Sequence, residues 1–429
     1  MRRRRFIATS ATAAGALALG CAPAGVAASQ DGGGEAMAPL PPSIRDLKPL
    51  APAPVPIAKA EREARIEKAR RLMADNHLDA IFMEGGTSLF YFTGVRWGLS
   101  ERTFGVVIPR NGEIAWVTPA FEEARARELI QFGTDIRTWQ EDESPFALVA
   151  GVLRDRGVAT GRVGMEERVR FFIADGIHLE APHLQITSAT PVTAGCRMIK
   201  SPAEIALMQH ANDITITAYK AAWQTLQEGM SQDELARNIT TAFNKLGADG
   251  DVSVQFGKYT AFPHGSATPQ HLREGDVVMI DDGVKVEGYT ADITRTGVFG
   301  KPTQRQRDIW DLERHAQDAG FRAAQVGVPC EDVDAAARKV ITDAGFGPGY
   351  KVPGLPHRTG HGIGLDGHEW TYFVKGNKTP IQPGMCFSDE PTIAIYGEFG
   401  IRLEDCLHIT ENGPRFFTAQ APSIDQLFV

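Results

Sequence analysis

The chain has 429 residues, of which 43% are hydrophobic and 23% are charged, and its formal net charge is −8 at pH 7. This length allows two domains with a large core, and the composition is that of an ordinary globular protein. The acidic balance argues against nucleic acid as a partner, because binding to phosphates needs a basic surface.

The first 28 residues have the pattern of an export signal. Arg2–Arg5 precede a run of small and apolar residues, which is shorter than the ~20 apolar residues that span a bilayer. Adjacent arginines followed by Phe6 and Ile7 resemble a twin-arginine signal, which carries folded proteins across a membrane. We therefore expect residues 1–28 to direct export, to the periplasm. A lipid anchor at Cys21 stays open, as does a disordered N-terminus with chance arginines.

The next segments predict a linker and then a domain. Residues 29–57 are rich in glycine and proline without periodicity, which is typical of a linker. Residues 58–195 alternate helical patterns with short apolar runs, which indicates an N-terminal α/β domain. The helical patterns cover 58–78, 121–132 and 144–157, and the apolar runs cover 79–85, 88–94, 103–109 and 113–119.

The remaining residues, 196–429, form a second predicted domain that contains firm helical signals. In three places a Ser or Thr precedes a Glu or Gln by three residues, which is the capping box of a helix N-terminus. We expect a helix after each of the pairs Ser201/Glu204, Ser231/Glu234 and Thr303/Gln306.

Two segments of this second domain resemble each other. In "HLREGDVVMID" and "PIQPGMCFSDE" a glycine is followed at the same spacing by an acid, as Gly275 by Asp281 and Gly384 by Glu390. This repetition suggests an internal duplication of a helix–strand unit. Each segment continues toward a second expected strand with another acid, Asp292 in the first and Glu404 in the second.

These four acids predict a metal site. Strand alternation places Asp281 on the same face as Val277 and Met279. Four carboxylates inside a sheet would repel one another and lose hydration unless cations compensate them. Oxygen ligands together with one or two imidazoles suit Mn²⁺, Zn²⁺, Co²⁺ or Fe²⁺. The alternative is that these acids are solvated on exposed strand faces. This alternative explains one pair of strands with two acids better than it explains two such pairs.

The segment "GHGIGLDGHE", residues 360–369, raises two other interpretations. A phosphate-binding loop is not supported, because no strand–GxGxxG–helix unit surrounds it. A zinc-protease helix is not supported either, because Tyr372 stands where the second histidine of HExxH would be. The cysteines after the predicted signal have no metal-finger spacing, and we expect buried free thiols, with a disulfide as the alternative: Cys196, Cys330, Cys386 and Cys406.

Four motifs in order resemble one family. "DDGVKVEGYTADITRT", "GHGIGLDGHE", "SDEP" and "GIRLED" are similar to the pita-bread metallopeptidases, in the branch of prolidase and aminopeptidase P. The resemblance covers nearly all of the chain after residue 58. It implies an α/β (α+β) fold, with an N-terminal creatinase/prolidase-type α/β domain and a pseudo-symmetric pita-bread catalytic domain.

The resemblance also implies a ligand set for two divalent metals, with Mn²⁺ as the first choice. It assigns Asp281 to one metal, Asp292 and Glu404 to both, and His361 and Glu390 to the other. A water that bridges the metals would be the nucleophile, and Glu390 would move its proton.

Further active-site residues follow from the same motif positions. His264 corresponds to a substrate-contacting histidine and His368 to the histidine that hydrogen-bonds the scissile carbonyl. His357 corresponds to a further active-site histidine, with a packing role as the alternative. Arg402 corresponds to an arginine that orients ligands or binds a substrate carboxylate, with a plain ion pair as the alternative.

The implied activity is hydrolysis of Xaa-Pro bonds in short proline-containing peptides. Dipeptidase and aminopeptidase remain alternatives, as do a small non-peptide substrate and a non-catalytic binding protein. Gly367 and the "WTYF" that follows Glu369 depart from the prolidase pattern, which leaves the proline preference less secure than the metal site. The branch also implies a homodimer.

Overall fold

The computed structural model describes residues 39–429. The predicted export signal, with the candidate lipidation site Cys21, lies outside the described residues, and so do residues 29–38 of the predicted linker. Within residues 39–429, no helix is both long and apolar enough to pass through a membrane.

The rest of the predicted linker is partly folded. Helix α1 (Pro42–Arg45) contacts α8 (Pro202–Trp223) and α9 (Gln232–Leu246), and its Ile44 is fully buried. Leu47 and Leu50 pack against the same apolar cluster. The prediction of a linker as far as residue 57 is corrected here, because these apolar side chains lose exposed surface by packing on the two helices.

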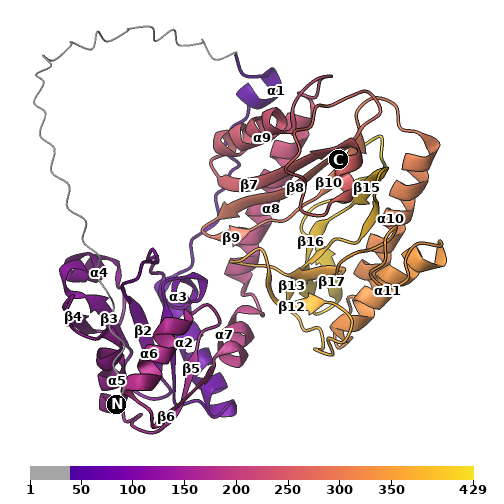
Figure 1. Ribbon diagram of the computed structural model, residues 1–429. Helices are drawn as coiled ribbons and strands as arrows, with labels where there is room; N and C mark the ends of the chain where they lie inside the picture. The colour runs from indigo at the N-terminus through magenta and orange to yellow at the C-terminus, as the bar shows by residue number, and fades with distance from the viewer. Residues whose placement is uncertain (1–38) are drawn as a thin grey trace, which may run out of the picture. The chain divides into compact units, whose positions relative to one another are not determined.

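The N-terminal domain is a six-stranded sheet with helices on both faces, drawn in indigo to magenta in Figure 1. Along β1, Ile81 and Met83 join one buried cluster, whereas Ala80 and Phe82 join the other. This alternation explains the unbroken apolar run, because a strand covered on both faces needs apolar residues at every position. The sheet order is β4–β3–β2–β1–β5–β6. The strands are β1 (Ala80–Glu84), β2 (Gly105–Pro109), β3 (Ala115–Pro119), β4 (Asp135–Trp139), β5 (Gly161–Met165) and β6 (Leu184–Ser188).

The three predicted helical patterns of this domain are helices in the structure, and the helices at residues 87–93, 171–180 and 190–197 were not predicted. The apolar run 88–94 is helix α3 (Thr87–Thr93), which ends at Gly94 in the left-handed conformation. Periodicity alone does not distinguish a short buried helix from a strand, so the sequence left this run unassigned. The other helices are α2 (Lys59–Asp75), η1 (Ala120–Glu122), α4 (Glu123–Leu129), α5 (Pro145–Asp155), α6 (Phe171–Glu180) and α7 (Thr190–Arg197).

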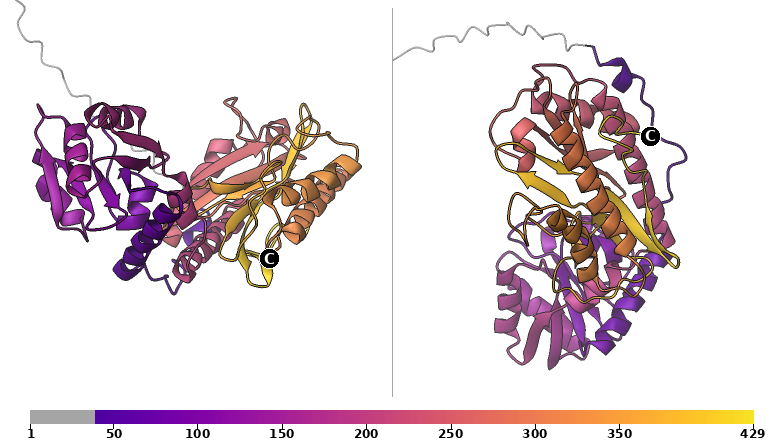
Figure 2. Two further views of the ribbon diagram at one scale, coloured as in Figure 1. Left: turned by 90° about the horizontal axis from the view of Figure 1, so that it is seen from below. Right: turned by 90° about the vertical axis from the view of Figure 1, so that its right-hand side faces the viewer.

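The C-terminal domain has two pairs of long helices that cover antiparallel sheets. All three predicted capping boxes are formed, at the starts of α8, α9 and α10 (Gln304–Ala323). The fourth long helix is α11 (Cys330–Asp343), and Figure 2 shows α10 and α11, in orange, lying over the yellow strands. One sheet has the order β10–β8–β7, with β9 paired to β8, and the other has the order β12–β11–β13–β16–β17.

The strands of the first sheet are β7 (Asp249–Phe256), β8 (Val277–Val286), β9 (Tyr289–Thr290) and β10 (Arg295–Val298). Those of the second are β11 (Gly360–Gly362), β12 (Glu369–Phe373), β13 (Cys386–Asp389), β16 (Asp405–Thr410) and β17 (Gly413–Phe416). Strands β14 (Thr392–Ile395) and β15 (Phe399–Arg402) pair with each other, and the short helix η2 (Gly257–Ala261) follows β7.

The predicted duplication is visible in the backbone. We call residues 202–299 the first half and residues 304–416 the second half. Gly275 and Gly384 precede β8 and β13 with φ angles of 87° and 86°. Their amide groups donate equivalent hydrogen bonds of 2.8 Å, to the carbonyl oxygens of Phe299 and Ile409. The pseudo-symmetric pita-bread architecture is therefore confirmed, as is the mixed α/β class of the whole chain.

Candidate metal centre

The five predicted metal ligands come from both halves of the C-terminal domain. Asp281 lies within β8, His361 lies in β11, and Glu390 directly follows β13. Asp292 and Glu404 occupy matching breaks, between β9 and β10 and between β15 and β16. The prediction placed these two acids within second strands, and this detail is wrong. At both positions the regular strand stops, and the side chain is presented where two strands meet.

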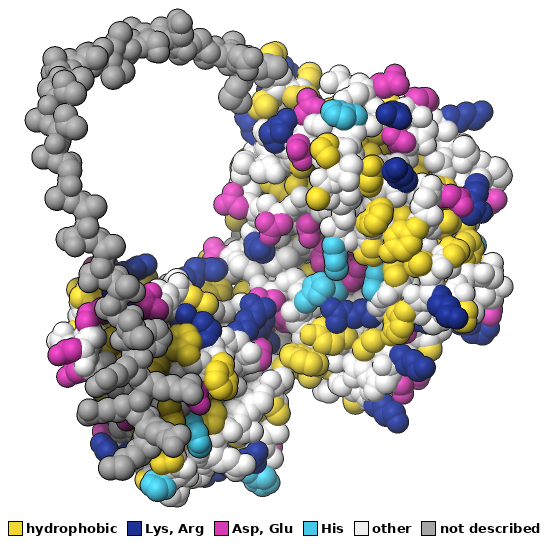
Figure 3. Space-filling view, in the orientation of Figure 1, with side chains coloured by type: hydrophobic (Ala, Val, Ile, Leu, Met, Phe, Trp, Pro, Cys, Tyr) yellow, Lys and Arg dark blue, Asp and Glu magenta, His cyan; other side chains and the backbone are white. Residues whose placement is uncertain are grey.

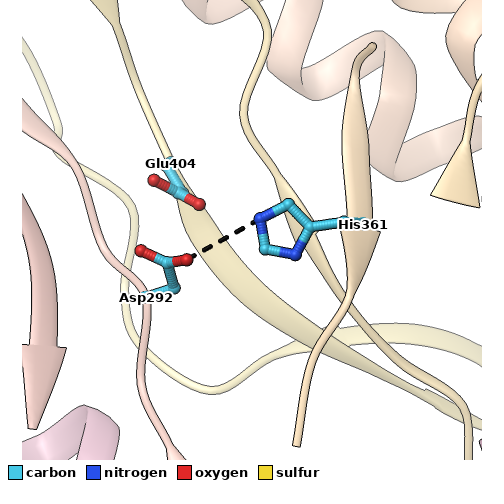
Figure 4. Close-up of side chains that lie close together, drawn as sticks. All are labelled: Asp292, His361 and Glu404. Atoms are coloured by element: carbon cyan, nitrogen blue, oxygen red, sulfur yellow. Dashed lines mark ion pairs between the residues drawn. The ribbon is translucent and has the colours of Figure 1, made fainter. Parts of the chain in front are cut away.

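Three of these side chains lie together as a candidate metal site (Figure 4). Ligand atoms of Asp292, His361 and Glu404 are all within 4.8 Å of one another. The Nε2 atom of His361 lies 3.7 Å from Asp292 Oδ2 and 3.0 Å from Glu390 Oε1. Two carboxylates and an imidazole at these distances match the donor types that bind divalent transition metals.

Asp281 joins this group through two other side chains. The Thr294 hydroxyl is within hydrogen-bond distance of Asp281 Oδ1 and 2.7 Å from Glu404 Oε2. The Arg402 guanidinium donates to Asp281 Oδ2 and, over 2.9 Å, to the Thr294 hydroxyl. All five predicted ligands are therefore connected in one cluster, although Asp281 is held by an arginine rather than in direct contact with the other four.

The electrostatics of the cluster favour a bound cation. Burial raises the pKa of Asp292 and that of Glu404 well above the ordinary range. Neighbouring carboxylates raise both pKa values further, with Asp281 the strongest neighbour of Asp292 and Asp292 the strongest neighbour of Glu404. The buried Oε1 atom of Glu404 has no hydrogen-bond partner among residues 39–429. Buried, unpaired carboxylate oxygens are costly, and a divalent cation would compensate them. The residues present therefore fit the metal that the sequence predicted.

His361 is oriented as a ligand. Its Nδ1 atom lies 3.1 Å from the carbonyl oxygen of Gly362, to which it donates, so the Nε2 lone pair faces the carboxylates. Burial lowers the pKa of His361, but Glu390 and Asp292 outweigh it and raise the pKa above the ordinary value. Burial would raise the pKa of Glu390, whereas His361, His357 and Arg402 lower it well below the ordinary range.

His368 lies beside the cluster at the surface. Its ring stacks on that of His361, with centroids 3.8 Å apart and an interplanar angle of 27°. It also lines a cavity of about 160 Å³ together with Trp370 and Tyr372. Figure 3 shows histidine side chains gathered in a hollow on this face. The predicted position of His368 next to a metal ligand and open to substrate is compatible with this geometry.

The two other predicted histidines differ in exposure. His264 is exposed and borders a separate cavity of about 280 Å³, and it makes no side-chain hydrogen bond or ion pair with residues 39–429. His357 has both ring nitrogens engaged, because Nδ1 donates to the Arg358 carbonyl over 2.7 Å and Nε2 lies 3.1 Å from the Thr392 hydroxyl. His357 thus has the geometry of a packing and positioning residue, which was the alternative interpretation of this histidine.

Arg402 is a ligand-orienting residue in this arrangement. It is 3% exposed, and its third nitrogen donates to the Pro263 carbonyl oxygen over 2.9 Å. Because Asp281, Thr294 and Pro263 occupy its donors, the guanidinium is directed at the ligand cluster. Of the two predicted roles, contact with a metal ligand fits this geometry better than binding of a substrate carboxylate.

The loop between His361 and His368 is held by a buried charge cluster that the sequence did not reveal. Arg197 Nη2 lies 2.6 Å from Asp366 Oδ2 and 2.5 Å from Glu369 Oε1. Lys200 Nζ lies 3.1 Å from the other oxygen of Glu369. Burial would raise the pKa of Glu369, but Lys200 and Arg197 lower it to about 2. The two acids that flank His368 are therefore fixed by cations from far along the chain.

Other functional contacts were also missed. Thr294 lay inside a quoted motif, and its position two residues after Asp292 was the only available signal. Arg358 contacts His368, and no spacing rule predicts that contact. The four cysteines after the predicted signal are free and buried, as expected: Cys196, Cys330, Cys386 and Cys406.

Comparison with known proteins agrees with the fold. The profile of the creatinase/prolidase N-terminal domain matches residues 65–199, and that of metallopeptidase family M24 matches residues 206–411. The chain is 35% identical over 387 residues to an uncharacterized peptidase of Schizosaccharomyces pombe, covering 85% of this chain and 83% of that protein. It is 30% identical over 360 residues to a Xaa-Pro dipeptidase of Lactobacillus helveticus, covering 82% and 96%.

A solved structure gives the same result. The dipeptidase PepE from Mycobacterium ulcerans superimposes with a TM-score of 0.80 at 30% identity, covering 87% of this chain and 99% of that one. The chain therefore belongs to metallopeptidase family M24. Within that family it carries the creatinase/prolidase N-terminal domain of the prolidase branch, and it is a metallopeptidase of a family whose members use divalent metals. The family and the fold implied by the sequence motifs are thus confirmed.

Proposed function

We propose that this metallopeptidase hydrolyses Xaa-Pro bonds in short peptides. Relatives and structural neighbours named as Xaa-Pro dipeptidase and prolidase support this substrate class. The observation that carries the proposal is the buried cluster of Asp292, His361 and Glu404, with its unpaired Glu404 oxygen. We assign two divalent metals to Asp281, Asp292, His361, Glu390 and Glu404, with Mn²⁺ as the first choice.

The metals would polarise the scissile carbonyl and lower the pKa of the attacking water. Glu390 would accept a proton from that water and deliver it to the leaving nitrogen. A group with this role must be ionised at neutral pH, and the low pKa of Glu390 meets that requirement. The Ser388 hydroxyl, 3.1 Å from Glu390 Oε1, would hold the carboxylate in place.

The residues around the metal ligands would have different roles in the reaction. His368, stacked on His361 and exposed on its outer side, would donate a hydrogen bond to the scissile carbonyl. His264, exposed on its loop, would contact the bound peptide. Arg402 would keep Asp281 oriented, and His357 would keep the segment around Arg358 in place.

Three further proposals rest on the sequence and the family. The first 28 residues would direct export to the periplasm through a twin-arginine route, and Cys21 would be the attachment point if a lipid anchor is present. The active assembly would be a homodimer, as expected for this branch. The substrates would be short peptides that contain proline, cleaved as dipeptides or from the N-terminus of longer peptides.

Assay of the Mn²⁺-loaded chain with Xaa-Pro dipeptides and tripeptides tests the substrate class. We expect turnover of at least one of the two series and none of matched peptides with alanine in place of proline. In Glu390→Gln, turnover should fall by about 10³-fold or more while the fold stays intact. A metal-loaded chain that cleaves neither series would contradict the substrate class, and an active Glu390→Gln would contradict the proton role.

A further inference from the structure

Arg358 makes a contact that constrains the chemistry of His368. Its Nη2 atom lies 2.8 Å from Nδ1 of His368. We propose that Arg358 is a positioning residue that keeps His368 in the tautomer with its proton on Nε2. The consequence for the reaction rests on the proposed function, in which His368 donates to the scissile carbonyl.

The tautomer follows from the hydrogen-bonding capacity of the two groups. A guanidinium carries only donors and stays protonated in proteins, so it never accepts a hydrogen bond. The His368 Nδ1 atom must then be the acceptor, and a neutral ring must carry its proton on Nε2. The opposite tautomer would direct an N–H group at another N–H group at hydrogen-bond distance.

Arg358 is held at both its ends. Its guanidinium carbon lies 4.1 Å from the centroid of the Tyr372 ring, a cation–π contact. Its backbone is fixed by α11, because Arg338 donates to the His357 carbonyl over 2.7 Å and Asp334 accepts from the Thr359 amide over 3.0 Å. No carboxylate lies within 4.0 Å of this guanidinium in the part of the chain that the structure describes, so no acid competes with His368 for its donors.

His368 is equally constrained. Its ring is stacked on His361, and the flanking acids Asp366 and Glu369 are bound by Arg197. Its Nε2 atom has no hydrogen-bond partner among residues 39–429. Both members of the Arg358–His368 contact are thus fixed by separate anchors, and the one ring nitrogen left over carries the proton.

This arrangement makes His368 a donor before substrate arrives. Developing negative charge on a carbonyl oxygen needs a hydrogen-bond donor that is already in place. Without Arg358 both neutral tautomers would be accessible, and the Nδ1–H form would present a lone pair to the carbonyl. The rate of the chemical step would fall, while the groups that hold the peptide would remain.

Nitrogen NMR of the full chain tests the tautomer directly. Spectra of ¹⁵N-histidine-labelled protein are recorded metal-free and with Zn²⁺, which is diamagnetic, and His368→Gln identifies the His368 resonances. We expect a pyridine-type Nδ1 signal and a pyrrole-type Nε2 signal in the parent. Arg358→Met should shift both toward the average of two tautomers, and Arg358→Lys, which still offers only donors, should restore them.

Kinetics supply the second readout. In Arg358→Met we expect kcat to fall about 10- to 100-fold with KM nearly unchanged, and Arg358→Lys to recover most of the loss. Arg322→Met is the matched control and should resemble the parent, because Arg322 is exposed on α10 and its side chain makes no hydrogen bond or ion pair among residues 39–429.

Two results would overturn the proposal. One is an Arg358→Met spectrum identical to the parent spectrum, and the other is a rise in KM alone, which would make Arg358 a substrate-binding residue. A fully active His368→Gln would instead contradict the role of His368 in the proposed function, and the NMR result would still decide the tautomer.

Discussion

The two halves of the C-terminal domain share a backbone plan but differ in what they contribute. The first half supplies Asp281 and Asp292, which are carboxylates only. The second half supplies Glu390 and Glu404 and, in addition, His361 and the neighbouring histidines. The matching turns at Gly275 and Gly384 and the matching breaks at Asp292 and Glu404 preserve the duplication, whereas the one histidine among the predicted ligands, His361, comes from the second half.

The loops next to the two sheets are also held by different contacts. In the second half, the loop that carries His368 is fixed by the buried cations Arg197 and Lys200. In the first half, the segment that leads to His264 is held by single hydrogen bonds, such as the one from Arg402 to the Pro263 carbonyl. The loop that carries His368 is thus anchored by buried ion pairs that have no counterpart in the contacts named for the segment of His264.

The largest expected effect comes from removing the charge that fixes the second loop. Glu369→Gln leaves Lys200 and Arg197 facing a neutral group, and we expect a loss of about 3 kcal/mol in the free energy of unfolding at pH 7. Because the pKa of Glu369 in the folded chain, about 2, lies below the ordinary glutamate pKa of 4.5, this contribution is present above pH 4.5. It is lost as the pH falls through 2, so the difference between parent and variant should shrink over that range.

Denaturant unfolding of both proteins between pH 2 and pH 7 measures this difference. The matched control in the first half is Asp251→Asn, which removes an exposed ion pair with Lys285 and should change stability by less than about 0.5 kcal/mol. A Glu369→Gln deficit that is constant with pH would show that the ion pairs are not its cause.

A smaller difference in stability is expected between alanine substitutions at the two matching glycine turns. Gly275→Ala should lower the free energy of unfolding by about 1 kcal/mol, because φ is positive at this position. The added Cβ atom would meet no atom within 4 Å, so a steric clash adds nothing to this loss. Gly384→Ala should cost ~1 kcal/mol more, because its Cβ would lie 2.9 Å from Ile199 Cγ2 and 3.1 Å from the Lys200 carbonyl oxygen. Thermal unfolding compares the two variants, and equal losses would mean that the second turn is not tied more closely to its surroundings.

Much of this organisation could be predicted from the sequence, because it is encoded locally. The three capping boxes, the paired glycine turns and the motif acids each depend on residues a few positions apart. The docking of Ile44 and the helical form of residues 87–93 depend on tertiary packing, which periodicity does not report. The contact of Arg358 with His368 depends on the β11–β12 pairing, whose register shifts between His361 and Gly362. No spacing in the sequence indicates such a shift.

The central claim is that acids from both halves and one histidine together hold two divalent metals. Elemental analysis of the full chain, reconstituted with Mn²⁺ and freed of excess metal, tests it most directly. The account predicts two metal ions per chain, with Asp292→Asn and Glu404→Gln each binding fewer. Less than one metal ion per reconstituted parent chain would contradict it.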